Sequence, residues 1–300
     1  MKRINYLYLS ILAIILTACS PSLNSIKKFA ATEKYPVDDY LDTVTIKRAL
    51  IIVAHDDDDC AMSGTISKLT AGGWDILNLS LTTHHAEAGI NNHPSEVICN
   101  GHEEILTDGI YRIDTTSGDK KYMPFPKTEF DKIYLKDKIS KAVIKQINEF
   151  QPTVIFTLDN EIGGYGHPDH VFMSQLILDL AEADSIHPQR IYQSVFTNHM
   201  EHEIVEVWLD ARLKKWGYPN MYTMAKQIYG VSGMPDPNIE INIKSQAELK
   251  MKYLLSYDDE ARKSFRKFIP YYEEFDAKEY FGIFDREFFR IIELNQKNEL

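Results

Sequence analysis

The chain has 300 residues, of which 44% are hydrophobic and 26% charged, a composition that excludes disordered and fibrous proteins. Its formal net charge of −11 at pH 7 argues against nucleic acid as a partner, because so acidic a surface gains nothing by releasing counterions from a phosphate backbone. The length allows one large α/β domain that buries a substantial core.

The first residues are typical of a targeting signal. A short basic start precedes an apolar run from Tyr6 to Leu16, which is too short for a membrane span and indicates a signal peptide. The ending Leu16-Thr-Ala-Cys19 resembles a bacterial lipobox. We therefore expect residues 1–18 to be a lipoprotein signal peptide and Cys19 to carry a lipid; a simple signal peptide with an incidental cysteine is the alternative. Residues 19–46 would then be a lipidated N-terminus and tether, on a protein of the bacterial cell envelope that is anchored to a membrane and faces out of the cytoplasm.

Apolar strands alternate with helices along the rest of the chain, which is predicted to form a single domain over residues 47–300. Strands are predicted at 48–54, 74–81, 153–158 and 190–196, and helices at 65–71, 101–109, 135–150, 170–183 and 247–255. This order predicts an α/β fold with a Rossmann-like, mostly parallel sheet and helices on both faces. Ligands of such sheets bind beyond the carboxyl ends of the strands.

Three further segments depart from this alternation. Residues 198–237 are predicted to be an insertion that borders the site, residues 239–243 resemble an edge strand, and the aromatic-rich tail 265–292 is expected to pack over the core. Apart from Cys19, the cysteines are Cys60 and Cys99, which are too few for a disulfide framework. Buried free thiols are favoured over a pair.

An acidic cluster, Ala54-His-Asp-Asp-Asp-Asp59, directly follows the first predicted strand. Adjacent carboxylates repel one another, so a fixed turn that holds them needs a compensating positive charge. A solvated acidic loop does not explain why the run lies between a core strand and the small, apolar stretch from Cys60 to Gly64. A calcium loop is disfavoured because the interleaved spacing and central glycine of an EF-hand are absent.

A second cluster, Gly163-Gly-Tyr-Gly-His-Pro-Asp-His170, directly follows the third predicted strand. Its glycines allow the backbone to come close to a ligand, and the spacing of His167 and His170 lets both imidazoles face one pocket. Together the two strand ends offer two imidazoles and a carboxylate. Such a set leaves a tetrahedral Zn²⁺ one open position for water, as in catalytic zinc sites, and a nearby carboxylate can accept a proton from that water.

At these motifs the sequence resembles the PIG-L/LmbE-like family, the N-acetylglucosaminyl-phosphatidylinositol de-N-acetylases and their bacterial relatives. The family motif Ala-His-Pro-Asp-Asp-Glu is similar to residues 54–59, and its His-Pro-Asp-His is matched in full by residues 167–170. Residues 163–166, Gly-Gly-Tyr-Gly, match the sequence that precedes this motif in sugar-deacetylating members, and residues 250–256 resemble a less distinctive segment of the family. The resemblance implies an LmbE-like fold and a zinc-dependent hydrolase that removes the acetyl group from an N-acetylated amino sugar or glycoside.

The resemblance also implies roles for the residues of both clusters. Three residues would be the metal ligands that bind Zn²⁺: His55, Asp58 and His170. Asp57 would be the general base for the attacking water. His167 would stabilise the oxyanion or protonate the departing amine, Asp169 would orient and tune His167, and Tyr165 would help to hold the oxyanion.

This sequence departs from the family pattern in three places, none of them at a proposed ligand. Asp56 replaces the usual proline and adds a charge beside the metal, and Asp59 replaces the usual glutamate. Relatives carry an arginine shortly before a glutamate after the second strand, where this chain has Asn100-Gly-His-Glu-Glu104. A substrate contact made by that arginine is therefore not expected here.

Two other functions stay open on the sequence alone. One is a lipid-anchored glycan-binding protein whose metal site, altered by Asp56, is not catalytic. The other is an amidase or deacylase that acts on another N-acyl compound, because a metal site recognises only the amide. For the favoured function, the expected partners are an N-acetylated sugar or glycan and, through the lipid on Cys19, a membrane.

Overall fold

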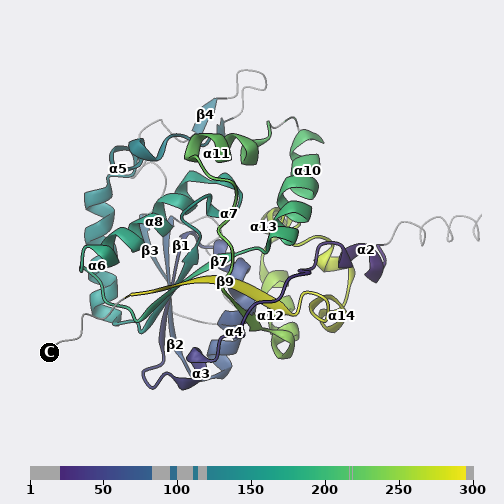
Figure 1. The fold of residues 1–300 in the computed structure, drawn as a ribbon, viewed down its shortest axis with the longest axis horizontal. Coiled ribbons are helices and arrows are strands. Elements are labelled where there is room, and N and C mark those ends of the chain that lie inside the picture. Colours follow the sequence, from purple (N-terminus) through teal and green to yellow (C-terminus); the bar gives the residue numbers. More distant parts are fainter. Residues whose placement is uncertain are drawn as a thin grey trace, which may run out of the picture.

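A seven-stranded sheet runs through the centre of the computed structural model, which describes residues 21–82, 95–99, 111–113, 120–215, 217 and 219–294 (Figure 1). Its strands, in spatial order, are β3 (Ser95–Cys99), β2 (Asp75–Thr82), β1 (Arg48–His55), β6 (Val154–Leu158), β7 (Arg190–Val195), β9 (Arg286–Glu293) and β8 (Ile239–Asn242). The strands from β3 to β7 are parallel, and β9 runs antiparallel to both β7 and β8. A separate antiparallel pair joins β4 (Tyr111–Ile113) to β5 (Lys120–Tyr122). The prediction of an α/β fold with a mostly parallel sheet is confirmed.

The apolar run of β1 is buried on both faces because helices cover both sides of the sheet. Ile51 and Val53 belong to one hydrophobic cluster, and Leu50 and Ile52, which point the opposite way, belong to another. The main helices of the first cluster are α4 (Ser63–Ala71), α12 (Ala247–Ser256), α13 (Asp259–Phe265) and α14 (Ala277–Phe281), and two short N-terminal helices add Ile26 and Leu41. Those of the second are α5 (Phe130–Ile133), α6 (Lys136–Phe150) and α8 (Pro168–Glu182).

The five predicted strands agree with β1, β2, β6, β7 and β8 to within one residue at each end, and β8 lies at the edge of the sheet as expected. Two strands of the seven-stranded sheet, β3 and β9, were not predicted, and neither was the separate pair β4 and β5. The aromatic tail contains β9, so part of it lies within the sheet rather than over it. The predicted helix at 101–109 lies outside the described residues.

The predicted insertion at 198–237 is mostly helical in its described part. It contains α9 (Asn198–Met200), a π-helix (Glu201–Leu209), α10 (Asp210–Lys215) and α11 (Met221–Tyr229). Apolar residues of this segment, among them Ile204 and Tyr222, form a third hydrophobic cluster with Phe288 of β9. The segment is therefore packed on the end of the sheet nearest β9, where it borders the pocket described below.

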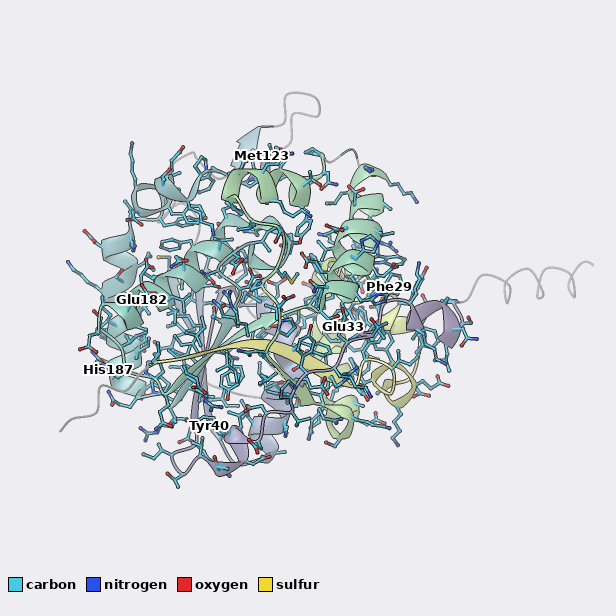
Figure 2. All side chains as sticks on the ribbon, in the orientation of Figure 1. Phe29, Glu33, Tyr40, Met123, Glu182 and His187 are labelled. Carbon is cyan, nitrogen blue, oxygen red and sulfur yellow. The ribbon has the colours of Figure 1, made fainter. Side chains whose placement is uncertain are left out.

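The segment predicted to be a tether packs against the body from Ile26 onward. Ile26, in α2 (Leu23–Lys27), and Phe29 are both fully buried. Phe29 and Glu33 lie near each other in Figure 2, and the carboxylate of Glu33 accepts a hydrogen bond from the backbone N–H of His199 at 2.8 Å. The structure differs from the prediction here because apolar side chains within this polar segment find buried sites. A second short helix, α3 (Tyr40–Thr43), follows before β1.

The predicted signal peptide and Cys19 lie outside the described residues, so the structure does not bear on either. Within the described part of the chain, no helix combines the length and the apolar character needed to cross a bilayer.

Candidate metal centre and active site

The acidic turn after β1 holds two of the predicted ligands. His55 is the last residue of β1, and Asp58 is the first residue of a 3₁₀ helix, Asp58–Met62. Asp58 Oδ2 accepts a hydrogen bond from the backbone N–H of His55 at 2.8 Å. This contact folds the carboxylate back over the turn, so that it lies beside the imidazole at the carboxyl end of β1.

The neighbouring carboxylates of the turn have different environments. Asp59 is buried, and its Oδ1 accepts hydrogen bonds from the hydroxyls of Tyr253 and Tyr257. Burial raises the pKa of Asp59 to about 7, although the bond from Tyr253 opposes the shift. Asp57 is buried too, but it lines the same pocket as the predicted ligands. The turn therefore separates its acidic groups, because one is held by tyrosines and another faces the pocket.

The loop after β6 brings the third predicted ligand into place. The carboxylate of Asp159, directly after the strand, accepts hydrogen bonds from the backbone N–H groups of Gly163 at 3.1 Å and Gly164 at 2.7 Å. Gly163 has a φ of +62°, and a Cβ there would lie 2.7 Å from the Cβ of His170. Its carbonyl oxygen lies 3.0 Å from His170 Nδ1. Glycine is thus required at this position so that the loop can approach and orient the histidine.

The three predicted ligands meet in one buried group, with one potential ligand atom from each within 4.8 Å of the others. His170 Nε2 lies 3.2 Å from Asp58 Oδ1 and 3.2 Å from His55 Nδ1. His55 Nδ1 lies 3.3 Å from Asp58 Oδ2. The structure therefore brings together the side chains of two distant clusters, as the sequence predicted.

This donor set fits a zinc ion. His170 directs Nδ1 to the carbonyl of Gly163, and His55 directs Nε2 to a carboxylate of Asp169, so each ring presents its other nitrogen to the shared point. Burial lowers the pKa of His55, but the carboxylates of Asp58 and Asp169 outweigh this effect and raise it well above its usual value. The group therefore stabilises positive charge, and two imidazoles and one carboxylate are the ligands of many catalytic zinc sites.

Asp169 contacts His55 more closely than it contacts His167. Its Oδ2 lies 3.1 Å from His55 Nε2, and its Oδ1 accepts a hydrogen bond from the hydroxyl of Tyr134 at 2.7 Å. The distance from Oδ1 to His167 Nδ1 is 3.8 Å. The sequence predicted that Asp169 orients His167, whereas the structure makes His55 its nearer partner. Tyr134 was not predicted, because nothing in its local sequence marks it.

His167 caps the N-terminus of α8, where its Nδ1 accepts a hydrogen bond from the backbone N–H of Asp169 at 3.3 Å. Burial holds the pKa of His167 well below its usual value, so the ring is neutral and carries its proton on Nε2. The ring stacks on that of His170, with centroids 4.7 Å apart. Tyr165 lines the same pocket, with its ring centroid 6.0 Å from that of His167. Both predicted oxyanion residues are therefore beside the metal group.

Two further groups lie close to Asp57. Burial lowers the pKa of Lys267, and the carboxylate of Asp57 partly offsets this effect, which places the ammonium group within its electrostatic reach. Sequence reasoning missed Lys267, which follows α13 and is far from both motifs. Cys60 lines the pocket as a free thiol, and burial raises its pKa well above the usual value. Cys60 and Cys99 are not joined in a disulfide.

The chain shows similarity to known proteins across this region. Residues 50–181 match the model of the PIG-L family, described as GlcNAc-PI de-N-acetylase. Two proteins named 1D-myo-inositol 2-acetamido-2-deoxy-alpha-D-glucopyranoside deacetylase are similar to it. The protein from Rhodococcus erythropolis is 26% identical over 43% of this chain and 51% of its own length, and that from Rhodococcus jostii is 23% identical over 46% and 54%. The chain thus spans about half the length of these curated relatives.

Solved structures of low similarity include the N,N'-diacetylchitobiose deacetylase from Pyrococcus horikoshii, at 17% identity and a TM-score of 0.39 over 85% of this chain and 89% of that one. The zinc inhibited form of teicoplanin deacetylase Orf2 is 10% identical, with a TM-score of 0.44 over 83% and 99% of the two chains. The matched family segment includes both motifs that form the metal group, from His55 to His170. The similarity of this chain to the PIG-L family therefore covers residues 50–181, less than half of its length.

Proposed function

We propose that this protein is a metal-dependent hydrolase that removes the acetyl group from an N-acetylated amino sugar or glycoside. The observation that carries the proposal is the convergence of His55, Asp58 and His170 on one point, in a pocket that also contains Asp57 and His167. The match of residues 50–181 to the PIG-L family model and the names of the similar curated proteins support an N-acetylated sugar as substrate.

His55, Asp58 and His170 would hold the metal ion, for which we propose Zn²⁺. When bound, this ion polarises an amide carbonyl and makes a water molecule more acidic. Asp169 keeps the proton of His55 on Nε2, so that Nδ1 retains its lone pair. Gly163 does the same for His170 through the carbonyl oxygen that faces Nδ1.

Asp57 would move the proton of the reaction, and His167 would stabilise the oxyanion. Asp57 accepts the proton of the attacking water as the new carbon–oxygen bond forms. His167, a neutral ring, would donate a hydrogen bond through Nε2 to the oxyanion, because Nδ1 is occupied by the backbone N–H of Asp169, and the proton that Asp57 has accepted would pass to the amide nitrogen. The amide nitrogen leaves as an amine once it has received a proton, and the acyl carbon leaves as acetate. Tyr165 contributes a hydroxyl on the side of the pocket where the oxyanion develops.

The test is an acetate-release screen of the zinc-loaded protein over N-acetylated mono- and oligosaccharides and other N-acyl compounds. We expect one zinc ion per chain and acetate release that a chelator abolishes. His170→Ala removes a ligand and should abolish release, whereas His187→Ala, which changes an exposed histidine, should not. Full activity of His170→Ala would contradict the proposal. Glycan binding that is insensitive to a chelator, without acetate release, would favour a binding protein.

We also propose that the protein is a lipoprotein of the bacterial cell envelope, on the strength of the Leu16-Thr-Ala-Cys19 sequence. Ile26 is buried in the body, so a lipid on Cys19 would keep the body within about 25 Å of a membrane, given a reach of about 3.5 Å per extended residue. Incorporation of a labelled fatty acid by the native chain, and its loss in Cys19→Ser, is the expected result. Equal labelling of both chains would contradict it.

A further inference from the structure

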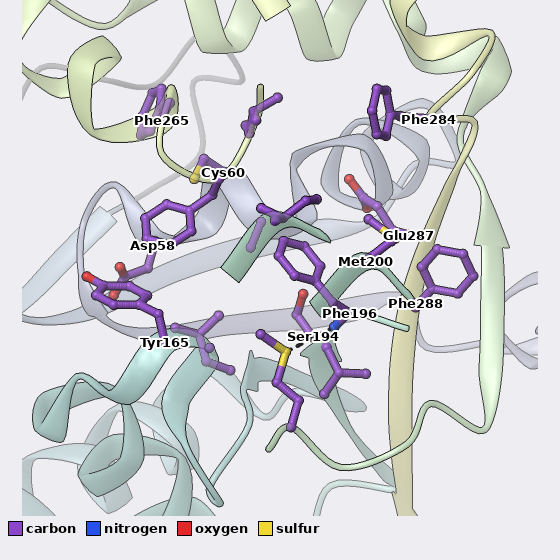
Figure 3. Close-up of a pocket in the computed structure, with 18 of the residues that line it drawn as sticks. Asp58, Cys60, Tyr165, Ser194, Phe196, Met200, Phe265, Phe284, Glu287 and Phe288 are labelled. Carbon is purple, nitrogen blue, oxygen red and sulfur yellow. Dashed lines mark hydrogen bonds between the residues drawn. The ribbon is translucent and has the colours of Figure 1, made fainter. Parts of the chain in front are cut away.

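The pocket that contains the metal group continues into an apolar chamber. The whole pocket has a volume of about 210 Å³ and extends from His55 and Asp58 past the carboxyl end of β7 to β9 and the segment after α14. Asp58 and Tyr165 lie at one end, and Phe284, Glu287 and Phe288 lie at the other (Figure 3). The space next to the metal group is therefore too long to be filled by an acetyl group alone.

Aromatic rings and methionines form most of the wall of this chamber. Its main apolar side chains are Phe196, Met200, Phe265, Phe268, Phe284 and Phe288. They come from the end of β7, from α9, from α13 and the turn after it, and from the region of β9. An engineered apolar cavity lined by similar side chains binds benzene, so a chamber with this lining is suited to a hydrocarbon.

The charged residues at the far end of the chamber are engaged with partners in the protein. Lys250 Nζ lies 2.5 Å from Glu287 Oε1. The carboxylate of Glu287 also accepts hydrogen bonds from the backbone N–H groups of Gly64 and Thr65, at 2.9 and 2.7 Å. Arg286 pairs with Glu240 at 2.7 Å. A sugar in this chamber would have to give up hydrogen bonds to water for contacts with aromatic carbon, which is unfavourable.

We propose that the substrate carries a hydrocarbon or aromatic group that occupies this chamber while its amide lies at the metal group. The inference rests on the proposed function and specifies its substrate class as amino sugars that carry an apolar group in addition to the amide. The apolar group belongs either to the acyl part or to the aglycone, which share the same chemistry. Each methylene buried in such a chamber contributes about 0.8 kcal/mol, which raises the binding affinity by about fourfold.

The experiment compares matched pairs of substrates on the zinc-loaded protein. Methyl and octyl glycosides of N-acetylglucosamine test the aglycone, and N-acetyl and N-octanoyl glucosamine test the acyl part, all below their micellar concentrations. Binding is measured by calorimetry, and kcat/KM by release of the acid. We expect the longer member of at least one pair to bind at least tenfold more tightly and to have a correspondingly higher kcat/KM. The pair that responds identifies the source of the apolar group.

Variants locate the effect in the chamber. Phe196→Ser and Phe284→Ser change half-buried rings of the wall and should reduce the preference for the longer member over the shorter one at least fivefold. Leu255→Ser, at a residue of α12 that is 43% exposed and outside the chamber, should keep the preference. A loss of preference in Leu255→Ser as well would overturn the assignment to the chamber.

The results separate this inference from the proposed function. The inference is overturned if acid is released without any preference for chain length, or if neither long substrate binds more tightly than its short partner. Acid release in either case leaves the proposed function in place. Tighter binding of a long member without release of acid from any substrate supports the chamber and overturns the proposed hydrolysis. Because the chain-length comparison is made on the native protein, it stands even where a variant fails to fold.

Discussion

Replacing Asp169 with asparagine tests how the metal group is held. The carboxylate accepts hydrogen bonds from His55 Nε2 and the Tyr134 hydroxyl, at 3.1 and 2.7 Å, and it is 1% exposed. An asparagine side chain has nearly the same shape and keeps one oxygen acceptor. It cannot serve both donors, because its second position is an NH₂ group. If that group faces His55, the imidazole must carry its proton on Nδ1, the atom that points to the metal group.

The expected effect is a weaker metal site rather than an unfolded protein. Loss of a carboxylate behind a ligating histidine typically weakens metal affinity by 10- to 100-fold, which corresponds to about 1.4–2.7 kcal/mol. The pKa of His55 is raised by Asp58 and Asp169 against the effect of burial. In Asp169→Asn it should therefore fall, because one of these two carboxylates is gone.

The assay is competition for Zn²⁺ between the protein and a chromophoric chelator at constant pH. Tyr134→Phe is the matched control, since it removes the other hydrogen bond to Asp169 but keeps the negative charge of the carboxylate. The zinc affinity of this variant should change by no more than about threefold, the effect of one ordinary hydrogen bond. Zinc affinity of Asp169→Asn within threefold of the native value would refute the reasoning, because the carboxylate would then not orient His55.

Three further predictions concern residues around the site. Gly163→Ala should destabilise the fold by about 1–3 kcal/mol and reduce zinc binding. The reason is that Gly163 has a φ of +62° and that a Cβ there would lie 2.7 Å from the Cβ of His170. Urea unfolding measures the loss of stability, and zinc titration measures the loss of binding. Lys250→Met should lower the free energy of unfolding by about 3–5 kcal/mol, because it leaves the buried carboxylate of Glu287 without its cation, as urea unfolding would show. Burial raises the pKa of Glu201 to about 7 from 4.5, so its contribution to stability is present below pH 4.5 and lost as the pH rises towards 7. In the native protein, the free energy of unfolding should therefore fall by at most about 3 kcal/mol between pH 5 and pH 8. Glu201→Gln should not show this fall, as urea unfolding at the two pH values would measure.

Controls and contrary outcomes are available for each. Gly164→Ala shares the positive φ but has open space around its Cβ, so equal loss of zinc binding in both glycine variants would show that the clash is not the cause. Lys252→Met changes an exposed lysine of the same helix, and an equal effect of the two lysine variants would exclude the ion pair as the source. An unchanged pH dependence in Glu201→Gln would show that another group titrates.

The strands and the metal group could be predicted because their signals are local. The run from Arg48 to Ala54 is apolar at every position after the first, which indicates a strand buried on both faces, and the structure has β1 there. The ends of parallel strands meet at one edge of the sheet, so His55 and His170 could be expected to converge although 115 positions separate them.

The parts that could not be predicted depend on contacts between distant segments. β9 lies in an aromatic tail without clear alternation, and its place between β7 and β8 is decided by pairing partners far away in the chain. Asp59 is held by Tyr253, 194 positions later, and no sequence pattern connects the two. The burial of Phe29 likewise could not be read from its polar surroundings. Such features follow from packing, which local propensity does not encode.

The contacts of Glu287 also set an order of events during synthesis. Its carboxylate binds the backbone N–H groups at the start of α4, the helix that follows the metal turn, and 223 positions separate it from Gly64. A nascent chain therefore exposes all three candidate metal ligands well before the strand that supports their turn has been made. Contacts so distant in sequence form late and slowly. The site can thus reach its final geometry only after β9 has joined the sheet, so any metal ion that binds earlier in synthesis binds a site that is not yet fully supported.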